Sequence, residues 1–246
     1  MNSGKKSHRQ NVDNLEKLSV QVATFEPVFN PSETRLSIPN QQQLKTRADG
    51  ALAGIMAAES ACNNAVSART TAFNGFDGLV TRVINAVRIS DVAGQTIEQA
   101  ESIVRELRNK RASVNVPPSE PTEGIEKVGA RRQNKMRSGS FNTKIENFSK
   151  LIVLLGTIPP YKPNETDLTI ASLKVKHEAL KLVNSICVTK DAEANAARNQ
   201  RDIILYTERT GLVDIASDVK LYVKSAYGAR SPQFKSVSGL AFSKLN

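Results

Sequence analysis

The stretch that decides the fold runs from Pro39 to Val87 and reads PNQQQLKTRADGALAGIMAAESACNNAVSARTTAFNGFDGLVTRVINAV. Apolar side chains recur in it every three or four residues, which is the spacing of one face of an α-helix. This spacing predicts one very long helix of about 45 residues, which Gly75 and Gly78 would kink or interrupt. The residues on that face are Leu44, Ala48, Leu52, Ile55, Cys62, Val66, Phe73, Phe76, Val80, Val83 and Val87.

Further helical periods lie on both sides of this stretch. They predict helices over Val12–Phe25, Ile97–Leu107 and Ile145–Leu155, and a second long helix from Leu173 towards Ile204 that continues to Tyr222. Ser231 and Pro232 are suited to the N-cap and first position of a last helix, which we expect to reach Phe242. No stretch shows the alternation of an amphipathic strand. The sequence therefore predicts an elongated all-α bundle whose long helices pair as in a coiled coil.

The two halves of the sequence resemble each other. Three matches are collinear, at offsets of 132 or 133 residues, which favours the tandem duplication of one helical unit. They pair Asn11–Leu18 with Lys144–Leu151, Val28–Ile38 with Pro160–Ile170, and Gly78–Val80 with Gly211–Val213. We therefore divide the chain into a basic N-terminal tail (1–10), a first helical repeat (11–111), a flexible basic linker (112–140) and a second helical repeat (141–246).

Most of the excess positive charge lies in the tail and around the linker. The chain has 34 Lys and Arg against 24 Asp and Glu, a net charge of +10, of which residues 105–137 carry +5. The linker is rich in Pro, Ser, Gly and Arg and shows no helical period, so one interpretation is a solvated connection. The other is a polyanion contact through five residues, although no aromatic side chains alternate with them for base stacking. These residues are Lys127, Arg131, Arg132, Lys135 and Arg137.

Residues that carry catalysis or bind metal are scarce. His8 and His177 are the two histidines, and the stretch His177–Lys181 has Lys where a zinc protease motif needs its second His. Cys62 and Cys187 stand far apart, without the paired spacing of a disulfide framework or a zinc site. No Gly-rich phosphate-binding loop is present. We therefore expect no catalytic, cofactor or metal site, and a protein that is not an enzyme.

Two similar loops are the most specific local feature. Each holds a Pro two residues before a Glu, and together they could form a partner-docking corner displayed twice. The structural interpretation is that Pro sets the turn and Glu interacts with the dipole of the next helix. The residues in question are Pro31, Glu33, Pro163 and Glu165. Arg69 and Arg201 occupy equivalent places in the repeat alignment, and we expect them to pair with acids across the bundle.

The sequence also indicates where the protein acts. Its longest unbroken apolar run, Leu151–Leu155, is far below the roughly 20 residues of a membrane-spanning helix. The basic start leads into a polar stretch rather than the apolar core of a signal peptide. These features predict a cytoplasmic protein without a transmembrane segment.

The motifs SHRQNV from Ser7, TGLVDIA from Thr210 and SPQF from Ser231, together with the Asn30–Pro31 loop, resemble a family from Bacteroidota. Its members are uncharacterised, internally duplicated helical proteins of similar length. The resemblance spans most of the chain outside the linker. It implies a bacterial cytoplasmic origin and no site residues.

Two functions are favoured by these features. The first is a non-enzymatic structural or scaffolding protein, a homo-oligomer or filament that assembles through its long helices. The second is a nucleic-acid-associated protein that binds through the basic tail and linker. A helical protein that inserts into membranes after rearrangement, and an enzyme with scattered catalytic residues, are weaker alternatives.

Overall fold

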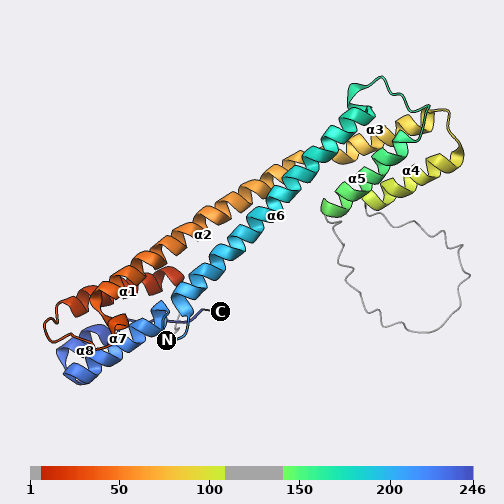
Figure 1. The fold of residues 1–246 in the computed structure, drawn as a ribbon. Coiled ribbons are helices and arrows are strands. Elements are labelled where there is room, and N and C mark those ends of the chain that lie inside the picture. The colour runs from red at the N-terminus through yellow and green to blue at the C-terminus, as the bar shows by residue number, and fades with distance from the viewer. Residues whose placement is uncertain (1–6, 109–140, 246) are drawn as a thin grey trace, which may run out of the picture. The chain divides into compact units, whose positions relative to one another are not determined.

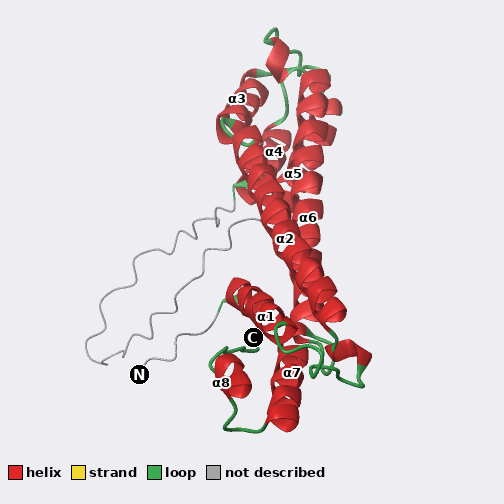
Figure 2. Cartoon of the chain, turned by 90° about the vertical axis from the view of Figure 1, so that its left-hand side faces the viewer, coloured by secondary structure: helices red, strands yellow, loops and turns green. Residues whose placement is uncertain are grey.

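A computed structural model describes residues 7–108 and 141–245, and within these ranges the regular structure is entirely helical (Figures 1 and 2). The prediction of an all-α protein is confirmed. The α-helices are α1 (His8–Ala23), α2 (Ile38–Ala72), α3 (Phe76–Ile89), α4 (Gly94–Leu107), α5 (Phe141–Gly156), α6 (Ile170–Tyr206), α7 (Leu212–Tyr227) and α8 (Pro232–Ser238). Two short 3-10 helices are η1 (Thr34–Leu36) and η2 (Thr166–Leu168).

The same order of elements occurs twice along the chain. A helix, a 3-10 helix and three further helices form the series α1, η1, α2, α3 and α4, and then the series α5, η2, α6, α7 and α8. Helix α5 begins and ends 133 residues after α1, and η2 begins 132 residues after η1. These spacings equal the offsets between the sequence matches.

The chain divides into two packed units, and neither unit is one of the two series. Unit 1 combines Met1–Asn64 with Thr189–Asn246, whereas unit 2 is the stretch Ala65–Val188. Unit 1 thus holds α1, η1, α7 and α8, while unit 2 holds α3, α4, α5 and η2. Helices α2 and α6 contribute residues to both units. Each unit therefore takes elements from both halves of the sequence.

The core of unit 1 forms where α1 and α7 bury their apolar faces together. Leu15 and Leu18 of α1 and Leu212 and Val219 of α7 are fully buried. Phe29, from the loop after α1, packs edge-on against the ring of Tyr222 at 5.3 Å between centroids. Burial of apolar area at these positions is the main source of stability of the unit.

The core of unit 2 is built around α3, α4 and α5. Phe148 of α5 is fully buried, and its ring meets Phe76 of α3 edge-on at 5.0 Å. Val83, Leu107 and Leu151 complete the fully buried centre. Helix α5 belongs to the second half of the sequence, so this core too joins the two halves.

The helix expected through Val87 is interrupted. Helix α2 ends at Ala72, and α3 starts at Phe76 after Gly75, whose φ is 74°. This left-handed backbone is open to Gly at little cost and strained for other residues. The second long helix also ends earlier than predicted: α6 stops at Tyr206, and α7 begins after Gly211.

The last predicted helix is confirmed at its start and wrong at its end. The hydroxyl of Ser231 accepts a hydrogen bond from the Phe234 amide at 3.0 Å, and Pro232 takes the first helical position. Helix α8 then stops at Ser238, so that Phe242 lies in an extended stretch. The backbone groups of that stretch find partners outside a helix.

Candidate functional site

The segment 239–245, here named the strap, has extended backbone after Gly239 and belongs to unit 1. Its side chains Leu240 and Phe242 are half-buried and pack against the unit 1 core. Because the strap has neither helical nor strand hydrogen bonds of its own, its backbone groups must be satisfied by other parts of the molecule. Side chains of α1 and α7 provide several of these partners.

Two asparagines of α1 bind the strap backbone. The Asn11 side-chain amide donates to the carbonyl of Ser243 at 2.8 Å and accepts from the Ser243 N–H at 3.2 Å. The Asn14 amide donates to the carbonyl of Ala241 at 2.8 Å. Asn11 is fully buried and Asn14 almost so. A buried amide without such partners would be costly, so these asparagines need the strap in place.

Charged side chains of α7 hold both ends of the strap. The ammonium group of Lys220 donates to the carbonyl of Ser238 at 2.9 Å and to that of Leu240 at 2.8 Å. Burial lowers the pKa of Lys220. Asp214 pairs with Lys244 of the strap at 2.9 Å. This hydrogen bond is the main cause of the lowered pKa of Asp214, and the Arg209 N–H adds to it.

A polar cluster around Tyr206 lies at the far end of the strap. The Tyr206 hydroxyl lies 2.6 Å from Nδ1 of His8, and hydrogen bonds from Asn11 and from the Leu245 backbone also reach it. Burial raises the pKa of Tyr206, so the phenol stays protonated at neutral pH. Burial, and then the nearby charge of Arg201, lower the pKa of His8, which favours the neutral ring.

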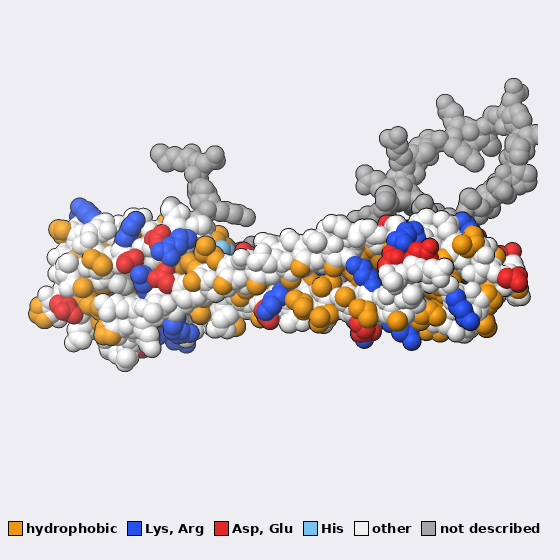
Figure 3. Space-filling view, turned by 90° about the horizontal axis from the view of Figure 1, so that it is seen from above, with side chains coloured by type: hydrophobic (Ala, Val, Ile, Leu, Met, Phe, Trp, Pro, Cys, Tyr) orange, Lys and Arg blue, Asp and Glu red, His pale blue; other side chains and the backbone are white. Residues whose placement is uncertain are grey.

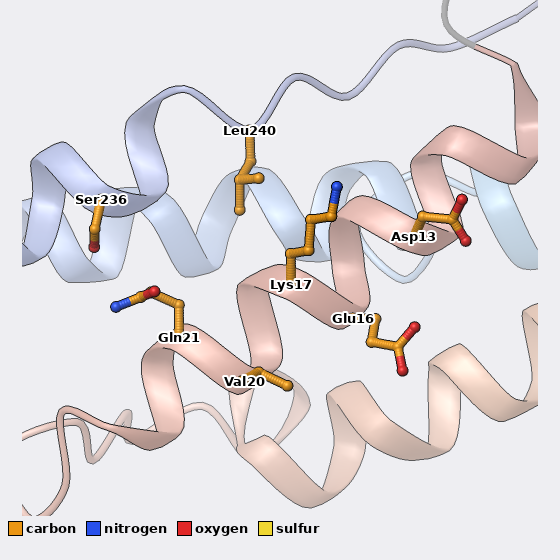
Figure 4. A pocket seen from close by; sticks show the side chains of 7 residues that line it. All are labelled: Asp13, Glu16, Lys17, Val20, Gln21, Ser236 and Leu240. Atoms are coloured by element: carbon orange, nitrogen blue, oxygen red, sulfur yellow. The ribbon is translucent and has the colours of Figure 1, made fainter.

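A shallow groove of about 760 Å³ runs beside the strap, between α1 and α8 (Figure 4). Leu240 points from the strap towards this space, and Val20 of α1 lies 65% exposed at its edge. Charged and polar side chains of α1 form the remaining wall, with Ser236 of α8 opposite. The groove is open and mixed in character, as expected of a surface that contacts a peptide rather than a small molecule.

The first predicted docking loop is occupied by contacts within unit 1. Pro31 is half-buried, and exposed Glu33 pairs with Arg35 at 3.5 Å. Arg35 also pairs with Asp218 of α7 at 2.7 Å and donates to the Arg209 carbonyl at 3.1 Å. The loop thus anchors η1 on α7. Its role in docking a partner stays a prediction.

The second predicted docking loop has the same form in unit 2. Pro163 is half-buried and Glu165 exposed. The buried Tyr161 donates its hydroxyl to the Leu168 carbonyl at 2.8 Å, and burial is the main cause that raises its pKa to about 12. Asp167 of η2 binds Arg82 of α3. A docking role stays a prediction here as well.

The expected pairing of two arginines with acids across the bundle is wrong for the described residues. Arg69 donates to the Asn184 side chain at 3.2 Å and lies over the Phe141 ring at 4.2 Å, while its Nε has no partner. Arg201 pairs with its own neighbour in α6, Asp202, at 2.8 Å. The amide and the aromatic face stabilise Arg69 where a carboxylate was expected.

The predicted polyanion contact lies outside the described residues, since Lys127, Arg131, Arg132, Lys135 and Arg137 all fall between 109 and 140. Within residues 7–108 and 141–245, His, Cys, Asp and Glu side chains do not gather in a group that could hold a metal ion. In the same ranges no helix is both long and apolar enough to cross a membrane.

Comparison with known proteins leaves the site to be interpreted on its geometry. No family model matches the chain, and neither a curated protein nor a solved structure is significantly similar to it.

The residues that bind the strap were missed by the sequence reasoning. Asn11 and Asn14 interrupt the apolar face that Val12 and Leu15 define, and such polar residues on a buried face need partners. That signal could have marked them as binding residues. Lys220 carries no comparable signal, because a lysine on an amphipathic helix is ordinarily solvated.

Proposed function

We propose that this chain is a non-enzymatic scaffold of the bacterial cytoplasm that assembles with copies of itself through its helices. The repeated order of elements supports, as part of the same proposal, an origin by tandem duplication. A duplicated protein presents similar surfaces more than once, which favours regular assembly.

An exposed apolar stripe on α6 carries the proposal. Within unit 2, Val175, Leu182 and Ile186 are 72%, 61% and 44% exposed. Their spacing of seven and four residues places them on one face of the helix, with the exposed Ala179 between them. Contiguous apolar side chains in water are a feature of interaction surfaces. Figure 3 shows other hydrophobic side chains exposed among charged ones on the visible face.

The test is the mass of the protein in solution. Size-exclusion chromatography with multi-angle light scattering, at low and high salt, should give a regular oligomer that persists at high salt, because apolar contacts are not screened. The double variant Leu182→Glu/Ile186→Glu should raise the dissociation constant at least about tenfold, or about 1.4 kcal/mol. Lys174→Glu/Lys181→Glu, which changes exposed positions on the same helix, is the matched control. A monomer across a wide concentration range would refute the proposal.

The charge distribution favours a second function, nucleic-acid association. Residues 105–137 carry nine basic and four acidic side chains. Replacing Arg131, Arg132, Lys135 and Arg137 with Ser should abolish retardation of DNA or RNA in a gel. Wild-type binding should weaken steeply with salt as counterions are released. Unchanged retardation by the variant would exclude this site.

A further inference from the structure

The strap is bound in a way that does not depend on the chain to which it belongs. Asn11, Asn14 and Lys220 bind it through the backbone groups of Ser238, Leu240, Ala241 and Ser243. Such contacts recognise extended backbone, and the pockets for alternate side chains set the register. Here Leu240 and Phe242 are those side chains, with one residue between them. Any identical segment would fit the same surface.

The strap is also joined to the rest of unit 1 by a connection that can change direction. Gly239 follows α8, and no atom outside its neighbours lies within 4 Å of the position its Cβ would take. The strap buries no side chain fully, and its two apolar anchors are only half-buried. Segments with few buried apolar contacts open at low free energy compared with a core.

The body of unit 1 keeps a binding surface when the strap leaves. Asn11 is fully buried, so strap release would leave its amide without the Ser243 backbone groups that it now binds. Lys220 would lose both of its carbonyl acceptors. These unsatisfied groups favour rebinding of an extended segment with the same backbone and the same anchors. A second copy of the chain supplies such a segment.

We propose that the strap exchanges between copies: the surface of α1 and α7 that binds segment 239–245 in one copy binds the same segment of another. This inference rests on the proposed self-assembly and names the surface that joins the copies. Reciprocal exchange gives a closed pair, whereas exchange in one direction gives an open chain of copies. The contacts within each unit 1 stay those described above, so exchange needs no new interface.

Photo-cross-linking of the full chain tests the exchange. Two versions are co-expressed with different affinity tags, and one of them carries Phe242→p-benzoylphenylalanine, which keeps an aromatic ring at the anchor. After irradiation, an adduct that contains both tags and maps to α1 or α7 of the untreated version shows exchange. In a fully exchanged mixture of equal amounts of the two versions, about half of the adducts should contain both tags, because the partners pair at random.

A matched control and a second placement keep the test decisive. Leu221→p-benzoylphenylalanine, on an exposed position of α7, should give adducts with both tags at no more than the collision background. If the variant at 242 fails to fold, Leu240→p-benzoylphenylalanine reports on the same surface. Adducts within single copies alone would overturn the exchange. Light scattering on the same sample then separates the proposals, since an oligomer leaves self-assembly standing and a monomer refutes both.

Discussion

Units 1 and 2 hold their 3-10 segments on a helix in the same way, but with the charges reversed. In unit 1 the cation lies on η1, where Arg35 pairs with Asp218 of α7 at 2.7 Å. In unit 2 the anion lies on η2, where Asp167 accepts two hydrogen bonds from Arg82 of α3, one of them at 3.0 Å. In both cases the 3-10 segment and its helix come from different halves of the sequence.

The reversal separates two docking sites that are otherwise alike. If η1 docked on α3, Arg35 would face Arg82, and η2 on α7 would bring Asp167 to Asp218. Like charges at these contacts oppose the mispairing, while the observed arrangement joins opposite charges twice. A chain with a repeated order of elements needs such a distinction, because its apolar patterns alone allow either pairing.

The largest expected effect is on the core that only unit 2 contains. Phe148→Ala removes a fully buried ring and should lower the free energy of unfolding by about 3–5 kcal/mol. Val153→Ala, at a 67% exposed position of the same helix, should change it by less than about 0.5 kcal/mol. Hydrogen exchange would show whether protection is lost first in Ala65–Val188. Equal loss in both units would mean that they unfold as one.

The turns before α3 and α7 should differ in their tolerance of a methyl group. A Cβ on Gly211 would lie 2.6 Å from the Thr207 backbone nitrogen, so Gly211→Ala should cost about 3 kcal/mol. Gly75 has open space but a φ of 74°, so Gly75→Ala should cost about 1 kcal/mol. Chemical denaturation of both variants measures the difference. Equal costs would contradict the close approach at Gly211.

The reversed ion pairs should give a smaller effect. Arg35→Asp places two acids together and should destabilise unit 1 by about 1 kcal/mol, the upper end for exposed pairs. The double variant Arg35→Asp/Asp218→Arg gives unit 1 the polarity of unit 2 and should recover most of that loss. Thermal unfolding at low and high salt is the measurement. No recovery in the double variant would show that the charges do not select the docking site.

The smallest expected effect is a pH dependence confined to unit 1. The pKa of His8 is lowered in the folded state, mainly by burial, from an ordinary value of about 6.5. The unfolded chain therefore binds the proton more readily, and stability falls as the pH decreases through this range. His8→Gln should flatten the profile of unfolding midpoint against pH between about 7.5 and 5.5. An unchanged profile would exclude His8 as the source.

The helices with strong apolar periods were predictable from the sequence. Val12–Phe25 and Ile97–Leu107 correspond closely to α1 and α4, because amphipathic spacing and burial agree there. The break at Gly75 was among the expected interruptions. The break at Gly211 was not, because the need for glycine there comes from the Thr207 backbone, a contact that no periodicity records.

The strap and the exchange of elements between the halves could not be predicted in the same way. Phe242 continues the spacing of Phe234 and Val237, so the pattern favours a helix, and tertiary contacts from Asn11 and Lys220 decide otherwise. The pairing of η1 with α7 depends on which similar helix is the partner. A single charge on each element distinguishes them, and its meaning appears only when the partner is known.

The division into units also sets an order for events on the ribosome. Unit 2 is the continuous stretch Ala65–Val188, and its core can close as soon as that stretch has emerged. Unit 1 needs both Met1–Asn64 and Thr189–Asn246, so α1 is synthesised long before α7 can cover its apolar face. The first helix to emerge is thus among the last to be buried. During synthesis its exposed leucines are a natural target for chaperones.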